Sequence, residues 1–522
     1  MKRNAFLLAA GSLVCAALTT SATTRYVNLN NPAPAPPYTS WSGAATNIQH
    51  AIDEAADGDE IVVTNGVYVT GGRAVFGTMT NRVAIDKAVT VRSVNGPLLT
   101  VIEGRAVAGT TNGDGGIRCV YVGAGAVLSG FTLTNGHTRT AGDYNKERSG
   151  GGAWCEWSGV VSNCTLSGNS AEAGGGARGG TLNNCTLSGN SASYGGGAYS
   201  GTLNNCTLSG NSASDYGGGA YKGTLNNCIV YYNSAPSGPN YDSGTFNYSC
   251  TTPLPPGPGN IEAEPLLASA SHLSAQSPCI GAGSSAYSQG VDIDGESWLE
   301  PPCMGADQFV EGHATGGLTA AITAGYTNVG TGFGVAFVGE ISGRVSASAW
   351  DFGDGVVVSN RPYASHAWAA PGLYEVRFIG YNDSYPGGVS ASVWVRVGAR
   401  EVYYADAANA APAYPYTNWV GAATNIQAAI DAGDQIGRLV LVADGVYGSG
   451  GWAVYGQMTN RVVVTEGVEV RSVNGPLLTV IEGLAVAGTT NGDGAIRCVY
   501  VGTNATADSR KAVSLNAGWK ER

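Results

Sequence analysis

Residues 150–235 read GGGAWCEWSGVVSNCTLSGNSA, EAGGGARGGTLNNCTLSGNSA, SYGGGAYSGTLNNCTLSGNSA and SDYGGGAYKGTLNNCIVYYNSA, which are four copies of one unit. One cysteine per copy recurs after 21, 21 and 22 residues, and one asparagine per copy keeps the same step. These residues are Cys164, Cys185, Cys206 and Cys228, and Asn169, Asn190, Asn211 and Asn233. A period near 21 residues, with short β-favouring pieces and glycine-rich corners, is typical of a β-helix.

Each unit predicts one coil of three short strands and three corners. Within residues 181–201, alternation points Leu182 inward and then Cys185 and Leu187 inward, so the chain must turn between them. Asn184 suits this corner because asparagine tolerates the left-handed backbone conformation. Successive coils would stack like residues about 4.8 Å apart, which predicts ladders of cysteine, leucine and hydrogen-bonded asparagine.

The stacked cysteines admit three interpretations. Neighbours would lie within the Cα range of a disulfide, but that bond also requires a suitable side-chain dihedral. Small buried thiols fit a narrow core better, and no histidine accompanies these cysteines as a zinc site would require. Outside the ladder, Cys279 and Cys303 flank a loop rich in proline and aspartate, and they are the pair that we would test first for a disulfide.

The composition excludes some classes of protein and favours others. The chain has 522 residues, enough for several domains, with 79 glycines and only 12% charged residues. Low charge with many small residues suits a tightly stacked β architecture. The net charge of −11 argues against nucleic acid as a partner, and the chain has no polybasic patch for a membrane surface.

Residues 1–22 have the pattern of a secretory signal peptide. Lys2 and Arg3 precede an apolar run that is too short to span a bilayer, and small residues follow it at the expected cleavage position. Cys15 allows a lipoprotein signal as an alternative, although Val14 is bulkier than that signal usually permits. No later run is long and apolar enough for a transmembrane helix. We therefore expect an extracellular or outer-surface protein.

A short helix is predicted before the first coil. Residues 25–45 form an extended, proline-rich lead-in, and Thr46 with Gln49 has the spacing of a capping box. One face of the helix is apolar, formed by Ile48, Ile52 and Ala55. The acidic residues of the helix and its end predict a solvated face, formed by Asp53, Glu54, Asp57 and Asp59. Such a helix would cover the open strand edges of the coil.

Two stretches resemble known β-helix proteins. IQHAIDEAADGDEIVVTNGVY at 48–68 resembles the start of the pectate-lyase-like right-handed parallel β-helix superfamily. SPCIGAGSSAYSQGVDIDGESWLEPPCMGADQF at 277–309 resembles the closing segment of bacterial β-helix surface proteins of the choice-of-anchor type. Together with the repeats, the resemblance covers most of residues 25–310. It implies the fold but not an activity, because the same fold serves lyases, hydrolases, adhesins and proteins without a known reaction.

Residues 318–398 change in character, because strand alternation becomes strong and aromatic residues replace cysteine. The motifs WDFGDG at 350–355, HAW at 366–368 and PGLYEV at 371–376 resemble a PKD domain, which implies an immunoglobulin-like β-sandwich. Trp350 and Phe352 would alternate onto its core face. Asp351 and Asp354 admit a cation site, but capping of a tight turn is the simpler interpretation, and His366 is expected to be structural.

Residues 402–502 repeat the beginning of the chain. Residues 471–502 match residues 92–123 at 30 of 32 positions, which indicates an internal duplication and a partial second β-helix. The first copy continues into further coils, whereas residues 503–522 lose the glycine-rich pattern. We expect this tail to be poorly ordered and the second β-helix to be the less stable of the two.

The sequence offers candidate binding residues but no catalytic set. Tyr199 and Tyr221 have the same place in neighbouring coils and predict an aromatic strip for sugar or protein contact, with an ordinary coil corner as the alternative. Asp292, Asp294 and Glu296 are the densest acidic trio away from the helix and predict a Ca²⁺ site, with an acidic turn as the alternative.

These observations predict an all-β protein: a right-handed parallel β-helix, an immunoglobulin-like sandwich and a partial second β-helix. We expect a secreted or surface scaffold, similar to an adhesin, that contacts polysaccharides or other surface proteins without catalysis and without a required cofactor. The alternative is a polysaccharide lyase or glycoside hydrolase on the β-helix face. The ladder region offers only scattered charged residues for such chemistry, namely Glu156, Glu172, Arg178, Asp215 and Lys222.

Overall fold

The computed structural model describes residues 22–464, 467–486, 492, 494–502 and 514–516. The chain divides into two compact units, which are residues 1–265 with 278–308, and residues 266–277 with 309–522. The predicted signal peptide lies outside the described residues except for Ala22. None of the helices that the structure describes is long and apolar enough to cross a membrane.

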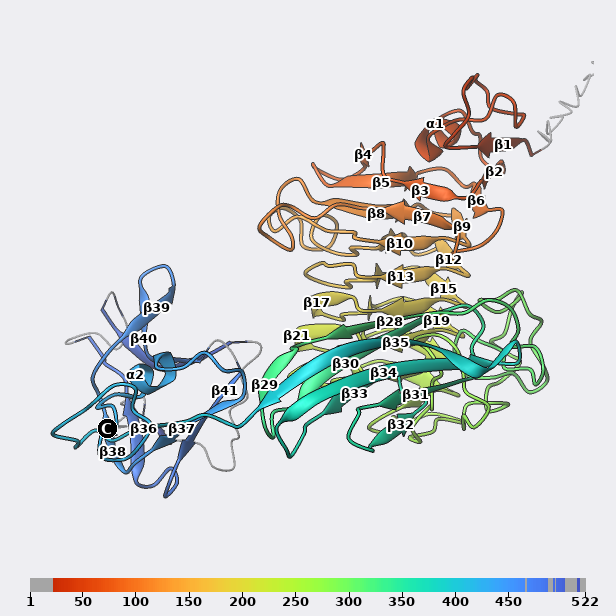
Figure 1. Ribbon diagram of the computed structural model, residues 1–522. Helices are drawn as coiled ribbons and strands as arrows, with labels where there is room; N and C mark the ends of the chain where they lie inside the picture. The colour runs from red at the N-terminus through yellow and green to blue at the C-terminus, as the bar shows by residue number, and fades with distance from the viewer. Residues whose placement is uncertain (1–21, 465–466, 487–491, 493, 503–513, 517–522) are drawn as a thin grey trace, which may run out of the picture. The chain divides into compact units, whose positions relative to one another are not determined.

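The first unit is a parallel β-helix in which each coil adds one strand to each of three sheets (Figure 1). Sheet A consists of β1 (Thr24–Val27), β2 (Glu60–Val63), β6 (Thr90–Ser93), β9 (Val127–Ser129), β12 (Val160–Ser162), β15 (Thr181–Asn183), β19 (Thr202–Asn204), β23 (Thr224–Asn226) and β26 (Thr245–Asn247). Sheet B consists of β3 (Gly66–Tyr68), β7 (Thr100–Glu103), β10 (Thr132–Thr134), β13 (Thr165–Ser167), β16 (Thr186–Ser188), β20 (Thr207–Ser209), β24 (Ile229–Tyr231) and β27 (Cys250–Thr251). Sheet C consists of β4 (Arg73–Ala74), β5 (Thr80–Ile85), β8 (Ile117–Val122), β11 (Ala153–Cys155), β14 (Ala177–Arg178), β18 (Ala198–Tyr199), β22 (Ala220–Tyr221) and β25 (Tyr241–Asp242). The predicted fold class is therefore confirmed.

The corner between sheets A and B has the predicted asparagine geometry. Asn163, Asn184, Asn205 and Asn227 all have positive φ angles between 48° and 53°. The turn reverses the side-chain alternation, so that the valine or leucine before it and the cysteine after it both point into the coil. One residue per corner thus sets the register of the whole stack.

The cysteine ladder fills the interior, as predicted. The four cysteines are fully buried free thiols, at Cys164, Cys185, Cys206 and Cys228. Burial, together with neighbouring thiols, raises the pKa of Cys206 well above its usual value. Its Sγ donates to the carbonyl oxygen of Asn204 at 3.3 Å. Cys279 and Cys303 are also buried thiols, so the disulfide that we would test first is not formed.

A second buried ladder consists of the repeated asparagines at the corner between sheets B and C. Asn190 Nδ2 donates to Asn211 Oδ1 at 2.9 Å, and Asn169 Nδ2 donates to Asn190 Oδ1 at 3.0 Å. Each amide also reaches the coil on its other side, because Asn190 Nδ2 donates to the carbonyl oxygen of Leu166 in the preceding coil at 2.9 Å. The ladder therefore joins each coil to both of its neighbours.

The helix before the first full coil, α1 (Ile48–Asp53), has a different cap from the predicted one. Asn47 is the N-cap, and its side chain accepts from the N–H of Gln49 at 2.8 Å. The Gln49 side chain does not reach back to Thr46; its Oε1 instead accepts from the N–H of Ala84 at 2.8 Å. The prediction of a capping box is therefore wrong, because a tertiary contact engages the Gln49 side chain. The prediction of a solvated acidic face is also wrong at Asp59, which is buried and pairs with Arg25 at 3.0 Å.

Residues 278–308 lie along the corner asparagines and do not add a coil. Asn163 Nδ2 donates to the carbonyl oxygen of Val291 at 3.0 Å, and Asn227 Nδ2 donates to that of Ser284 at 2.8 Å. The N–H of Ala306 donates to Thr207 Oγ1 at 3.0 Å on the outside of sheet B. This segment thus covers one side of the stack from β12 to β23.

The PKD-like part of the second unit is a β-sandwich with an aromatic core. One sheet consists of β28 (Thr319–Ala324), β30 (Val335–Ser342) and β33 (Tyr363–His366). The other consists of β29 (Asn328–Gly330), β35 (Tyr385–Gly398), β34 (Gly372–Asn382), β31 (Ala347–Asp351) and β32 (Val357–Ser359). Trp350 and Phe352 are buried in the core, as predicted.

The turn of the PKD-like part has the predicted structural capping. Asp351 Oδ1 accepts from the N–H of Gly353 at 3.0 Å, and Asp354 Oδ1 accepts from the N–H of Val356 at 3.2 Å. Asp354 Oδ2 lies 2.8 Å from His366 Nε2. The turn-capping interpretation is therefore confirmed, and His366 has the expected structural position.

The remainder of the second unit repeats the first coils of the β-helix. It contains α2 (Ile426–Asp431) and three short sheets. These are β36 (Val402–Ala405), β37 (Arg438–Val442) and β41 (Val468–Ser472); β38 (Gly445–Tyr447), β42 (Thr479–Glu482) and β44 (Ser514–Asn516); and β39 (Trp452–Tyr455), β40 (Met458–Val464) and β43 (Ile496–Val501). β44 pairs with β42 in parallel, and the rest of the predicted tail lies outside the described residues.

Candidate functional site

The candidate site lies on the outer face of sheet C, where one position recurs on successive coils. This position follows the GGGA motif of each repeat, and strand pairing places its residues directly beside one another. We call this row the sheet C ladder; its members are Tyr121, Trp154, Arg178, Tyr199, Tyr221 and Asp242. The preceding alanines point inward and are buried, which leaves the ladder side chains on the outside.

The N-terminal end of the ladder is covered by residues 139–148, which we call the cover loop. Tyr121 and Trp154 stack with ring centroids 5.5 Å apart, and both are buried. Trp154 Nε1 donates to the carbonyl oxygen of Asn145 at 2.6 Å, and Arg178 Nη2 donates to Asn145 Oδ1 at 2.7 Å. The cover loop therefore reaches Arg178, at the start of the open part of the ladder.

Four tyrosines form the open part of the site, and we call them the tyrosine cluster. Tyr199 and Tyr221 have ring centroids 5.4 Å apart. Tyr194 and Tyr216 come from the small sheet of β17 (Ser191–Tyr194) and β21 (Ser212–Tyr216), and their rings stack at 6.0 Å. Tyr216 also lies 6.2 Å from Tyr221. Three of the rings are half-buried and Tyr216 is exposed, so the cluster presents a firm aromatic surface to solvent.

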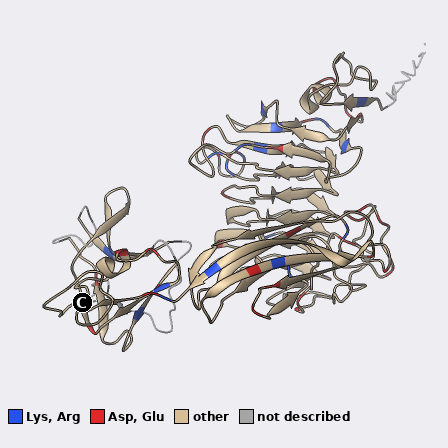
Figure 2. Ribbon diagram, in the orientation of Figure 1, with Lys and Arg blue, Asp and Glu red and all other residues tan. Residues whose placement is uncertain are grey.

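Cations border this aromatic surface. The Arg178 guanidinium lies 5.5 Å from the ring centroid of Tyr199, and Lys222 Nζ lies 4.9 Å from that of Tyr221. Burial lowers the pKa of Arg178 from its usual value. Burial and nearby groups, Tyr199 among them, raise the pKa of Tyr144 in the cover loop to about 12. Charged residues are otherwise sparse on the middle coils (Figure 2).

The structure thus brings the predicted binding residues together. The acidic candidates for catalysis lie apart from one another. Glu156 Oε1 lies 3.3 Å from the Tyr121 hydroxyl, and Glu172 pairs with Arg148. Asp215 is exposed beside Tyr216. These carboxylates have different neighbours, and the prediction that the chain has no catalytic residues remains a prediction.

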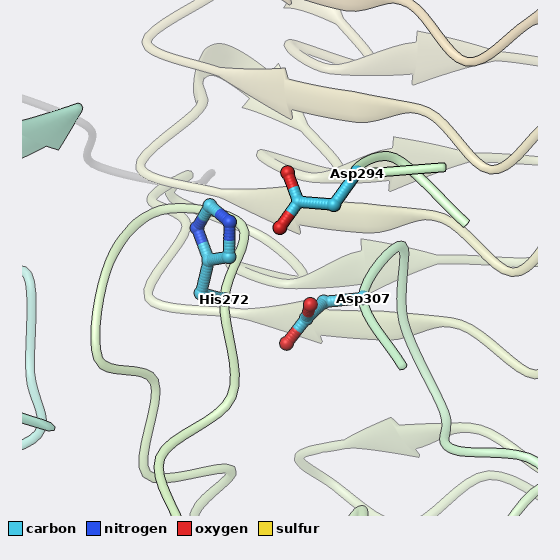
Figure 3. Close-up of side chains that lie close together, drawn as sticks. All are labelled: His272, Asp294 and Asp307. Carbon is cyan, nitrogen blue, oxygen red and sulfur yellow. The ribbon is translucent and has the colours of Figure 1, made fainter. Parts of the chain in front are cut away.

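The predicted acidic trio lies in the segment beside the corner asparagines. Asp292 is fully buried, and its carboxylate accepts from the N–H groups of Glu296 at 2.6 Å, Gln308 at 2.9 Å and Asp294 at 3.0 Å. Burial raises the pKa of Asp292 to about 6. These hydrogen bonds are those of an acidic turn, so the Ca²⁺ site at Asp292, Asp294 and Glu296 remains a prediction. Figure 3 draws Asp294 with Asp307, which is the residue just before Gln308.

Sequence reasoning found two members of the ladder and missed the rest. Arg178 was counted among the scattered charged residues, although strand pairing places it directly beside Tyr199. The missed signal is the residue after each GGGA motif, which is Trp154, Arg178, Tyr199 and Tyr221 in turn. The signal for Tyr194 and Tyr216 is their place directly before the glycine run.

Comparison with known proteins identifies one domain. Residues 319–396 match the PKD domain, which confirms the predicted sandwich. No curated protein matches the chain. PKD domains are common in surface and extracellular proteins, which is consistent with the expected location of this protein. The resemblance to β-helix proteins of the choice-of-anchor type remains a prediction.

Acid is expected to release the cover loop. Glu147 accepts from the N–H groups of Asp143 at 2.9 Å and Thr78 at 3.1 Å and pairs with Arg139, which together lower its pKa to about 2. Because this pKa lies below the usual 4.5, the stabilisation is complete above pH 4.5 and is lost as the pH falls toward 2. The protection factors of residues 139–148 in hydrogen exchange should fall over that range.

Glu147→Gln is the matched variant for the cover loop. It keeps the shape of the side chain but removes the charge, so exchange in the loop should be faster at pH 7 and should depend less on acid. Equal protection of the loop at about pH 3 and pH 7 in the unaltered protein would show that Glu147 does not hold it.

Proposed function

We propose that this protein is a secreted or cell-surface scaffold, similar to an adhesin, that binds a carboxylated polysaccharide along the tyrosine cluster. The observation that carries the proposal is the register of sheet C, which aligns Tyr199 and Tyr221 with Arg178 on adjacent strands. Parallel strands repeat about every 4.8 Å, so the surface offers similar contacts at regular intervals. A repeating polymer suits such a surface better than a compact ligand.

The chemistry of the cluster supports a sugar chain with acidic groups. Tyrosine rings provide flat apolar faces with a polar hydroxyl edge, which suits the alternating faces and hydroxyls of sugars. Arg178 and Lys222 border the rings at 5.5 and 4.9 Å from the nearest centroids. Their positive charges favour carboxylates, and the guanidinium geometry allows bidentate hydrogen bonds to one of them.

The PKD domain supports the same setting. Such domains often contact proteins or carbohydrates, and here the domain separates the β-helix from its partial duplicate in the sequence. We therefore infer a modular surface protein in which the first β-helix supplies the binding face. A protein partner at the tyrosine cluster is the alternative to a polysaccharide.

The test compares binding of residues 23–522 to polygalacturonate, alginate and a neutral mannan. The Tyr199→Ala, Tyr221→Ala double variant should weaken binding of the acidic polymers about tenfold or more, which corresponds to about 1.4 kcal/mol. Tyr385→Ala is the control, because Tyr385 is an exposed tyrosine, 42% accessible, on the PKD domain. Its binding should match that of the unaltered protein.

Two results would contradict the proposal. The first is equal binding of acidic polymers by the double variant, provided that thermal unfolding shows both proteins folded. The second is release of unsaturated product from the acidic polymers in the presence of Ca²⁺, lost on mutation of a nearby acid or base. That result would favour the polysaccharide lyase alternative over a scaffold.

A further inference from the structure

A second aromatic surface lies where the first three strands of sheet A end. A cleft of about 320 Å³ opens there, within the size range of small-molecule sites. We call it the Trp41 cleft; its lining residues are Asn28, Trp41, Thr64, Asn65, Val94 and Asn95. Asn28, Thr64 and Val94 directly follow β1, β2 and β6, so parallel pairing brings them to one edge.

Trp41 forms a supported but accessible platform in this cleft. Its ring centroid lies 4.4 Å from that of Tyr26 in β1, and 44% of the residue remains exposed. A ring backed by another ring loses little conformational freedom when a ligand covers it. The indole face and Val94 provide the apolar part of the lining.

Asparagine amides provide the polar part of the cleft. Asn95 Nδ2 donates to Asn65 Oδ1 at 2.8 Å, and Asn28 Oδ1 accepts from the N–H of Asn30 at 3.1 Å. Within the described part of the chain, Asn65 Nδ2, Asn28 Nδ2 and Asn95 Oδ1 make no further hydrogen bond. The lining therefore offers both donors and an acceptor without a formal charge, which matches the hydroxyl groups of a neutral sugar.

The partial second β-helix keeps the same aromatic pair. Tyr404 and Trp419 have ring centroids 4.6 Å apart, and Trp419 is 42% exposed. The polar side chains differ, because Asp406 and Asp444 replace Asn28 and Asn65. Asn474 Nδ2 donates to Asp444 at 3.1 Å, as Asn95 donates to Asn65 in the first copy. An exposed tryptophan thus persists in both copies although its surroundings have diverged.

We propose that the Trp41 cleft binds a neutral pyranose residue of a glycan, with the sugar stacked on Trp41 and its hydroxyls bonded to the asparagine amides. The duplicated surface at Trp419 binds the same class of sugar but rejects uronates, because two carboxylates replace the amides. This inference does not depend on the tyrosine cluster, which takes the carboxylated polymer.

Calorimetry with mannohexaose, cellohexaose and hexagalacturonate tests the proposal. The protein carries the Tyr199→Ala, Tyr221→Ala and Trp419→Ala changes, so that neither the tyrosine cluster nor the duplicated surface contributes. We expect at least one neutral hexasaccharide to bind, and Trp41→Ala to weaken that site about tenfold. Trp157→Ala is the control and should have no effect, because Trp157 is 89% exposed and lies outside the cleft.

Asn95→Ala separates sugar recognition from folding, since Trp41 also packs against Tyr26. This variant removes an exposed amide and should weaken the neutral sugar about fivefold, with an unchanged thermal transition. Binding that survives Trp41→Ala, or no neutral sugar bound at millimolar concentration by a folded protein, would overturn the proposal. Self-association abolished by Trp41→Ala, without sugar binding, would also overturn it and mark a protein interface.

Discussion

Asn190→Ala is expected to destabilise the first β-helix by about 4 kcal/mol. The Asn190 side chain accepts from the N–H of Asn169 at 3.1 Å and donates to the carbonyl oxygen of Leu166 at 2.9 Å. Alanine leaves both backbone groups in a buried place without these partners, and each unsatisfied group costs about 1–3 kcal/mol. It also interrupts the amide ladder at its middle.

The Asn204→Ala variant is the matched control for the buried ladder. Asn204 belongs to a parallel amide row, donating to Asn183 Oδ1 at 2.9 Å, but it is half-buried and water can replace the lost contacts. Its cost should stay below about 1 kcal/mol. Urea unfolding, followed by hydrogen exchange of residues 160–230, measures both losses. Similar losses in the two variants would show that burial of the ladder is not what makes it stabilising.

The repeats allowed the coil to be predicted in detail because identical residues stack on themselves. A one-residue slip would move Leu187 from the core to the surface, so the hydrophobic pattern permits one register. The corner asparagine followed from the change in side-chain alternation between Leu182 and Cys185. Both arguments use information within a single 21-residue unit, and the structure confirms both.

Features that depend on contacts distant in sequence were not predictable in this way. Asn47 caps α1 because Gln49 is taken by Ala84, which lies 35 residues away. Asp59 is buried by its contact with Arg25, 34 residues earlier. Residues 278–308 bind corner asparagines more than 50 residues distant. No local pattern encodes such pairings.

The candidate site was predictable only where its residues repeat within the 21-residue unit. Tyr199 and Tyr221 share a phase that the repeat displays directly. Trp154 and Arg178 occupy the same position in their coils. Because they differ in chemistry from tyrosine, the repeat alone does not mark the four residues as one set. The cover loop replaces a short corner with an irregular insertion, so its contacts with Trp154 and Arg178 appear only in three dimensions.

Gly196→Ala is expected to separate two coils and to cost about 3 kcal/mol or more. A Cβ atom at this position would lie 2.5 Å from the carbonyl oxygen of Gly218 and closer still to that of Ser212. Both obstacles are backbone atoms of the next coil, so no side chain can rotate away. The N–H of Gly196 also donates to the carbonyl oxygen of Gly217 at 3.1 Å. Moving the two coils apart to make room for the methyl group would lengthen this hydrogen bond.

Gly189→Asn is the control for Gly196→Ala, within the same coil. Gly189 has a φ of 63°, which asparagine tolerates, and a Cβ there meets only the Gly168 nitrogen, at 4.0 Å. We expect a loss below about 1 kcal/mol for this change. Urea unfolding of both variants decides between two explanations of the GGGA motif. If the two substitutions cost the same, the glycines serve backbone flexibility; if only Gly196→Ala is costly, they allow the close approach of coils that places the sheet C ladder in register.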